Sequence, residues 1–362
     1  AVRIAGFHPP RRPKRGNLLR RQYDTRMLQR SNPSEAWDFC RHILVDVSRS
    51  FAIIIPECPP PIDRALCVAY LLCRIADTIE DEPDLDESRR LELFDAFLRA
   101  LNDPGDEHAL SEFLNRWPAM EFSESGYGEL VRGTAHVLTV YCELPHEVRE
   151  PIRICVHEMV AGMRAIAPVE TRDGISFFCR DLSDLDRYCH IVAGTVGVMS
   201  TALFEWKLAG SGFEASPEWR EKGRRLGLGL QMTNIIKDCR VDAERRVSFI
   251  PSAYVTLNEG RFELTGPGRR EIFTRAVEHL DAGLEYTLTI PRENTGIRRF
   301  LLGSLLPAIA TLQVAASGTE HHPKIDRDKM MHIIELIAAE QVTDEAIRTW
   351  YAEHRASVLD LV

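Results

Sequence analysis

Two short acidic segments hold the residues of this chain best suited to chemistry. The carboxylates belong to Asp77, Glu80 and Asp81 in the first segment and to Asp238 and Asp242 in the second. All-oxygen ligands suit Mg²⁺, which keeps several waters and bridges carboxylates to substrate phosphates. The sequence has no His/Cys set at zinc-ligand spacing, and neither segment is a Gly-containing EF-hand loop. The segments therefore predict a Mg²⁺ centre that binds a diphosphate.

The first segment ends a predicted helix, at positions where apolar residues are expected. An apolar stripe through Leu66 and Cys73 continues to Asp77 and then to Glu80 or Asp81. A solvated charge run is the alternative, but the stripe argues against it. Buried carboxylates are costly unless cations neutralise them, so the stripe favours a metal site.

The second segment lies on another predicted helix. Asn234, Asp238 and Asp242 follow at i, i+4 and i+8, which places them on one face of a helix that is otherwise apolar. Gly227 and Gly229 weaken this helix and suggest close approach by another helix or a ligand. We expect the two acidic faces to lie opposite each other across a cavity.

Basic residues that could hold a diphosphate lie near both segments. Arg74 is one turn before Asp77, Lys237 directly precedes Asp238, and Arg49 lies shortly before the first acidic helix. A single arginine is more often a surface or ion-pair residue, so these residues carry weight only together.

Helical periodicity dominates the chain, strand alternation is almost absent, and the predicted fold class is all-α. The pattern predicts a helix that starts near Ser34 and runs to Val47, and a long helix with Pro61 in its first turn that runs to about Asp81. No linker divides residues 32–362, which we expect to form one catalytic domain. Further predicted helices cover residues 88–102, 107–115, 124–142, 146–166, 182–207, 217–243, 269–289, 297–316, 327–339 and 343–358.

Charge is unevenly distributed over the 362 residues. Residues 1–31 hold nine basic groups and one acid, a balance of +8, so a net charge of −9 leaves −17 for the rest. We expect this arm to be disordered and solvated, with contact to anionic lipid as the alternative. Basic and aromatic residues do not interleave on any segment, so no nucleic-acid partner is expected.

The sequence also bears on cellular location. No apolar core follows the N-terminal charges, so no signal peptide is expected. The stretch 300–316 is too short and interrupted to span a bilayer, which favours a buried or groove-lining helix. The nine cysteines form no CxxC pair and favour free thiols in a reducing, cytoplasmic compartment.

Four motifs in order resemble the squalene and phytoene synthases, which are all-α class I prenyl-transferring enzymes. The resemblance runs from about residue 34 to about residue 340, and Tyr-Cys-His-x-Val-Ala-Gly resembles the squalene synthase branch. The motifs cover residues 48–51, 70–81, 188–197 and 231–242.

The resemblance implies that Mg²⁺, as three ions with substrate, helps two farnesyl diphosphates to join head to head. Presqualene diphosphate is the implied intermediate, and NADPH then reduces it to squalene. An apolar cavity would keep water from the cation, and Tyr188 would stabilise that cation or relay a proton. The alternatives are a dehydrosqualene, phytoene or presqualene diphosphate synthase that does not use NADPH, and a non-catalytic diphosphate-binding protein.

The resemblance also implies roles for individual residues. The catalytic and metal-binding set is Tyr188, Asp77, Glu80, Asp81, Asn234, Asp238 and Asp242. The diphosphate-binding set is Ser48, Arg49, Ser50, Phe51, Tyr70, Arg74, Lys237, Arg245 and Arg246. The cavity set is Val192, Gly194, Gly197, Leu230, Gln231 and Pro307. The NADPH set is Arg74, Asn234, Lys324 and Arg327.

Two positions depart from the family pattern. Val247 stands where an arginine is usual, so Arg245 or Arg246 would have to replace that contact, and Gly303 stands where animal and fungal enzymes carry an aromatic residue. The C-terminal membrane anchor of eukaryotic relatives is not found in this sequence. We therefore expect at most peripheral membrane contact; separately, we expect a monomer.

Overall fold

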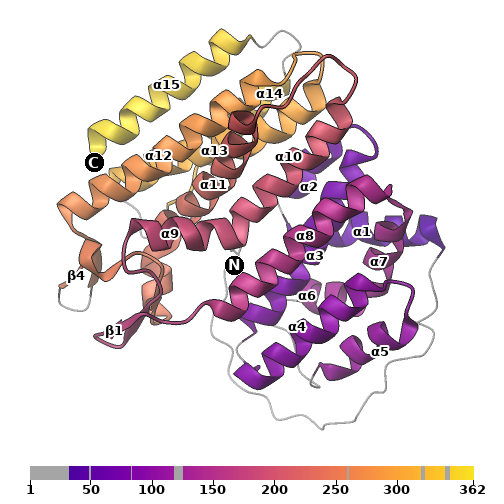
Figure 1. The fold of residues 1–362 in the computed structure, drawn as a ribbon. Helices are drawn as coiled ribbons and strands as arrows, with labels where there is room; N and C mark the ends of the chain where they lie inside the picture. Colours follow the sequence, from indigo (N-terminus) through magenta and orange to yellow (C-terminus); the bar gives the residue numbers. More distant parts are fainter. Residues whose placement is uncertain are drawn as a thin grey trace. The chain divides into compact units, whose positions relative to one another are not determined.

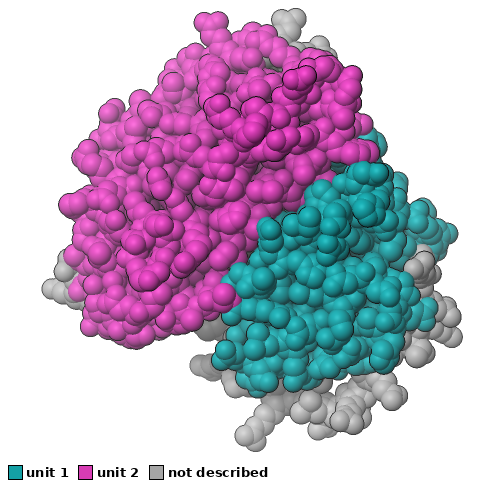
Figure 2. Space-filling view, viewed as in Figure 1, with its two compact units in different colours: residues 1–164 teal, residues 165–362 magenta. Residues whose placement is uncertain are grey.

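The computed structural model describes residues 32–48, 50–82, 84–117, 125–258, 261–318, 323–338 and 343–362. The basic arm predicted for residues 1–31 and the predicted ligand Arg49 lie outside these ranges. The chain divides into two compact units, residues 1–164 and 165–362, which Figure 2 colours separately. The single catalytic domain predicted for residues 32–362 stays a prediction, and each unit is described by itself.

The described part of unit 1 consists of helices and their connections (Figure 1). Helix α1 packs against α3 and α7, and α4 packs against α5. The helices of unit 1 are α1 (Pro33–Val47), α2 (Phe51–Ile54), the 3₁₀ turn Ile55–Glu57, α3 (Ile62–Asp81), α4 (Glu87–Asn102), α5 (Glu107–Arg116), α6 (Ser125–Arg132), α7 (Thr134–Glu143) and α8 (His146–Ala165).

Each predicted helix start in unit 1 lies within one residue of an observed one, whereas α2 and α7 have no predicted start. Helix α1 begins at Pro33, and the Asn32 side chain caps it by accepting a hydrogen bond from the Ser34 N–H at 3.0 Å. Pro61 immediately precedes α3 instead of lying in its first turn. Local capping chemistry fixes these boundaries, which is why the sequence predicts them closely.

One predicted helix, 124–142, is two helices in the structure. The break is at Gly133, where an added Cβ would lie 2.0 Å from the Phe39 ring of α1. Glycine therefore lets the aromatic ring of α1 approach the backbone between α6 and α7. The sequence marks the glycine but does not show which ring meets it.

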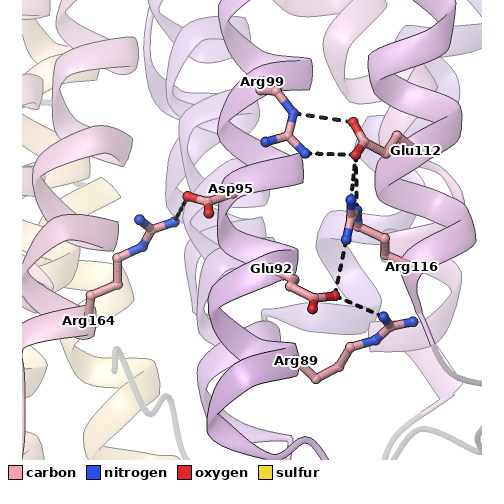
Figure 3. Close-up of polar contacts among 7 residues, drawn as sticks. All are labelled: Arg89, Glu92, Asp95, Arg99, Glu112, Arg116 and Arg164. Carbon is pink, nitrogen blue, oxygen red and sulfur yellow. Dashed lines mark hydrogen bonds and ion pairs between the residues drawn. The ribbon is translucent and has the colours of Figure 1, made fainter.

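Charged side chains join α5 and α8 to α4 (Figure 3). Arg116 of α5 bridges Glu92 of α4 at 3.1 Å and Glu112 of its own helix at 2.6 Å. Arg99 of α4 contacts the same Glu112 at 3.0 Å, and Arg164 of α8 pairs with Asp95. These side chains are between 28% and 54% exposed, so solvent screens the pairs and their net contribution to stability is small.

Unit 2 is built around the long helix α11, which packs against α10, α12 and α13. The all-α prediction is confirmed. The helices of unit 2 are α9 (Leu182–Cys189), a π-helical turn (His190–Gly194), α10 (Thr195–Leu208), α11 (Pro217–Glu244), the 3₁₀ turn Ser252–Tyr254, α12 (Gly266–Thr289), α13 (Thr295–Ser317), α14 (Arg327–Ala338) and α15 (Asp344–Leu361).

Unit 2 also contains five short strands that the sequence pattern does not predict. Strands β1 and β2 pair antiparallel, β2 pairs in parallel with β3, and β4 and β5 form a separate hairpin. Two to four residues are too few to show a period of two, so the pattern could not reveal them. The strands are β1 (Glu170–Arg172), β2 (Ile175–Phe177), β3 (Val247–Ser248), β4 (Val255–Asn258) and β5 (Arg261–Leu264).

The helix predicted for residues 182–207 is interrupted by the π-helical turn, and glycines bring this region against α11. An added Cβ at Gly197 would lie 2.5 Å from the Gly223 carbonyl oxygen, and one at Gly227 would lie 2.4 Å from the Ala193 oxygen. The close approach predicted from Gly227 is thus to another helix. Gly229 likewise approaches Leu280 of α12.

Cysteine and membrane predictions can be compared with the structure. All nine cysteines are free, and burial raises the pKa of Cys40 and Cys179 to about 12.

Two helical segments, 182–208 and 295–317, are long and apolar enough to cross a membrane by composition. The prediction that the stretch 300–316 is too short to span a bilayer is therefore wrong, because its helix extends over 295–317. In this helix 61% of the apolar window is buried inside the protein, as the prediction of a buried helix expects, and the two segments are weak evidence for membrane insertion.

Candidate functional site

The first acidic segment ends α3, and its three carboxylates are buried to different degrees. Asp77 is 2% exposed, Glu80 is partly buried, and Asp81, the last residue of the helix, is exposed. Asp77 is therefore buried as the predicted stripe expects, and of the two alternatives for the next position Glu80 is more buried than Asp81. The reason is that α3 is covered on almost every side up to Ile79 and emerges only in its last turn.

Arg74 is the buried cation beside Asp77. Its Nη1 lies 3.4 Å from Asp77 Oδ2, and its Nη2 donates to the Tyr70 hydroxyl at 3.0 Å. The rings of Tyr70 and Tyr127 have their centroids 5.5 and 5.7 Å from its Cζ. Burial lowers the pKa of Arg74, but Tyr70, Asp77 and Tyr127 outweigh burial and leave that pKa raised. Arg74 therefore keeps its charge and neutralises Asp77; its contacts with diphosphate and NADPH stay predictions.

The motif at residues 48–51 joins the same group. Ser48 is buried, and its Oγ accepts a hydrogen bond from the Phe51 N–H at 3.1 Å. The Phe51 and Tyr70 rings lie 5.4 Å apart, and the Tyr70 hydroxyl donates to the Val47 carbonyl at 3.1 Å. Ser50 is exposed. Unit 1 therefore brings together Ser48, Phe51, Tyr70, Arg74 and Asp77.

The second acidic segment lies near the C-terminal end of α11. Asp238 is 8% exposed and Asp242 5%, whereas Asn234, one turn earlier, is partly buried. Lys237 Nζ lies 3.2 Å from Asp238 Oδ2. The prediction of polar groups on a buried helix face is confirmed for α11. The two acidic segments belong to different units, so their mutual approach stays a prediction.

The chemistry of these donors fits Mg²⁺. Among the described residues, no group of three or more His, Cys, Asp or Glu side chains is arranged to hold a metal by itself. Mg²⁺ usually takes one or two carboxylates and completes its shell with phosphates and water. Asp77 in unit 1 and Asp238 and Asp242 in unit 2 are buried carboxylates that a cation would stabilise.

Tyr188 belongs to an aromatic stack that the sequence does not predict. Its ring lies 4.2 Å from that of Phe249, which lies 5.3 Å from that of Phe178. The pairing of β2 with β3 brings these segments together, and the Phe178 N–H donates to the Ser248 carbonyl at 2.9 Å. Tyr188 is 4% exposed. The only sequence signal for Phe249 is its position seven residues after Asp242.

The arginines proposed to replace the one expected at Val247 lie just after α11. Arg245 and Arg246 are both exposed, and Arg246 has a left-handed backbone with φ of 64°. The Arg246 Nη1 atom lies 3.7 Å from where a Cβ on Gly174 would be, so this side chain reaches the β1–β2 turn. Its contact with diphosphate stays a prediction.

The predicted cavity residues have mixed surroundings. Gly194 packs beside His190 and Leu228, and Gly197 against the α11 backbone, so both glycines serve helix packing. Their contact with substrate stays a prediction. Of the remaining cavity residues, Val192 and Gln231 are buried, and Leu230 and Pro307 are partly buried.

The residues predicted for NADPH are dispersed. Lys324 and Arg327 are exposed, and Arg327 is the first residue of α14. Arg74 lies in unit 1, whereas Asn234, Lys324 and Arg327 lie in unit 2. A common cofactor site stays a prediction.

The chain is similar to known proteins in sequence and in fold. The family model for squalene/phytoene synthase matches residues 44–327. Squalene synthase 1 of Arabidopsis thaliana is 27% identical over 80% of this chain and 67% of its own length. Inactive squalene synthase 2 of the same plant is 30% identical over 58% of this chain and 45% of its own length. The solved complex of TcSQS with the ligand E5700 has a similar fold, with a TM-score of 0.68, 23% identity, and coverage of 91% of this chain and 98% of that one.

Proposed function

The chain belongs to the squalene/phytoene synthase family of prenyltransferases, and from that premise we propose that it joins two farnesyl diphosphates head to head. The proposed product of this step is presqualene diphosphate, which NADPH then reduces to squalene. The relative named squalene synthase 1 supports this product. We also propose that the enzyme is a cytoplasmic monomer, at most peripherally bound to membrane.

The observation that carries the proposal is the burial of Asp77, Asp238 and Asp242 on helix segments whose neighbouring residues are also largely buried. Ionised carboxylates are retained in such surroundings only where cations offset the cost of burial. Arg74 and Lys237 supply part of that positive charge. Mg²⁺, when bound, would neutralise the diphosphate leaving group and favour its departure.

The side chains of this protein then have distinct tasks. Arg74 holds Asp77 in place, because the Tyr70 hydroxyl and the rings of Tyr70 and Tyr127 fix the position of the Arg74 guanidinium. Tyr188 offers a phenol and a ring face that can stabilise positive charge or move a proton at its hydroxyl oxygen. The stack with Phe249 excludes water from one face of that ring.

The cofactor assignment rests on charge. Lys324 and Arg327 are exposed cations three residues apart and suit the phosphate groups of NADPH. When bound, NADPH would supply the hydride of the second step.

The test is the product profile of the purified protein with farnesyl diphosphate and Mg²⁺, with and without NADPH. We expect squalene only when NADPH is present, and no turnover in EDTA. Products that do not change with NADPH would refute squalene synthesis and favour the dehydrosqualene, phytoene or presqualene diphosphate alternative. Tight diphosphate binding without pyrophosphate release would instead identify a non-catalytic binding protein.

Two substitutions test the acidic segments. We expect Asp77→Asn and Asp238→Asn each to lower turnover by about 100-fold or more, with helical circular dichroism retained. Asp63→Asn is the matched control, because Asp63 lies in the first turn of the same helix as Asp77 and should leave turnover unchanged. Near-normal turnover in either of the first two variants would contradict the assignment.

A further inference from the structure

Helix α9, which carries Tyr188, is attached to α12 through Asp186. The Asp186 Oδ2 atom accepts hydrogen bonds from Arg275 Nε at 3.0 Å and Nη2 at 2.6 Å. Its Oδ1 atom lies 3.1 Å from His279 Nε2. Both carboxylate oxygens are therefore engaged by the same neighbouring helix.

His279 extends this attachment to α11. It is 4% exposed, and its Nδ1 accepts from Arg225 Nε at 3.3 Å. Because Nδ1 accepts this hydrogen bond, a neutral His279 ring carries its proton on Nε2, and Nε2 then donates to Asp186. Burial opposes ionisation of Asp186, but His279 and Arg275 outweigh it and keep the pKa of that carboxyl lowered. We call Asp186, Arg225, Arg275 and His279 the α9 clamp.

The clamp and the Tyr188 ring lie on opposite faces of α9. Residues 186 and 188 are two apart, which is about 200° of rotation around a helix. One face is therefore held by the clamp, and the other places Tyr188 against Phe249 at 4.2 Å. Helix α9 has eight residues and continues into the π-helical turn. Leu185 and Cys189 are also buried on it, so the clamp acts together with core packing to set the rotation of α9.

We propose that Asp186 is a positioning residue, which acts with Arg275 and His279 to set the rotation of α9 and thereby the place of the Tyr188 ring. The catalytic part of this inference rests on the proposed function of Tyr188. Loss of the clamp would let α9 rotate, and a misplaced group near the reaction lowers turnover more than substrate affinity.

The first test is a double-mutant cycle with Asp186→Asn and Tyr188→Phe. We expect Asp186→Asn to lower kcat about 10- to 100-fold with little change in KM, and to cause no further loss in the Tyr188→Phe background. Losses that multiply in the double variant would overturn the proposal, since they would show that Asp186 acts independently of Tyr188.

The matched control is Glu205→Gln. Glu205 accepts from Arg220 Nε at 2.8 Å and Nη2 at 2.6 Å, so it makes a similar bidentate pair between α10 and α11 in the same unit. We expect this variant to change kcat by about two-fold or less. An equal loss of kcat in Glu205→Gln and Asp186→Asn would overturn the proposal.

The second test does not depend on turnover. With tyrosine replaced by 3-fluorotyrosine, the ¹⁹F signal that disappears in Tyr188→Phe reports the position of the Tyr188 ring over Phe249. We expect Asp186→Asn to shift this signal and Glu205→Gln to leave it in place. An unchanged signal in Asp186→Asn would overturn the inference even if no squalene is formed, whereas a shifted signal without turnover would support the clamp and refute only the proposed function.

Discussion

Replacement of Arg74 by methionine should destabilise unit 1 strongly, because it leaves Asp77 buried beside an apolar side chain. The two charges lie 3.4 Å apart and are 5% and 2% exposed. At an effective dielectric constant of about 20, their attraction is about 5 kcal/mol. Asp77 keeps its cost of burial when this attraction is removed, so we expect a loss of about 3–5 kcal/mol in the free energy of unfolding.

The assay is urea denaturation followed by circular dichroism, without metal or substrate. The double variant Arg74→Met/Asp77→Asn is the informative control, since it removes both charges and should recover much of the lost stability. A loss of less than about 1 kcal/mol in Arg74→Met would refute the reasoning, because that is the value of an exposed ion pair. Additive losses in the double variant would refute it as well.

Two further predictions concern packing and pH in unit 2. Gly227→Ala should lower the free energy of unfolding by about 1–3 kcal/mol, because the added Cβ would meet the Ala193 carbonyl oxygen at 2.4 Å. Gly266→Ala is the control, because its Cβ meets nothing within 4 Å, and it should be neutral or slightly stabilising. Equal effects of the two variants in thermal unfolding would contradict the packing argument. Arg180 and Arg187 lower the pKa of Asp184 from its ordinary value of 3.8 to about 2. These ion pairs therefore stabilise the folded protein fully above pH 3.8, and this stabilisation is lost as the pH falls through 2. Asp184→Asn should lower the free energy of unfolding by about 1 kcal/mol at pH 7, a small value because both arginines are 66% exposed and solvent screens the pairs. The difference in stability from the wild type should vanish near pH 2. A difference that stays constant between pH 7 and pH 2 would contradict this prediction.

The sequence predicts the helices and the buried acidic face of α11 well because both depend on local patterns. The 3.6-residue period gives the helix spans, and the i, i+4, i+8 spacing of Asn234, Asp238 and Asp242 gives one face of α11. Boundaries fall near capping residues such as Asn32, whose chemistry acts within a few residues. Local rules could not show that Asp81 emerges from the protein while Asp77 stays buried, because that depends on which helices cover α3.

The fold class and the acidic, basic and aromatic groups available for chemistry follow from sequence patterns alone. Which of these groups meet depends on how distant segments pack. Phe249 reaches Tyr188 because β2 pairs with β3, and Asp186 reaches His279 because α9 lies beside α12. These contacts join residues 61 and 93 positions apart, since folding brings distant segments together through packing that no local pattern records.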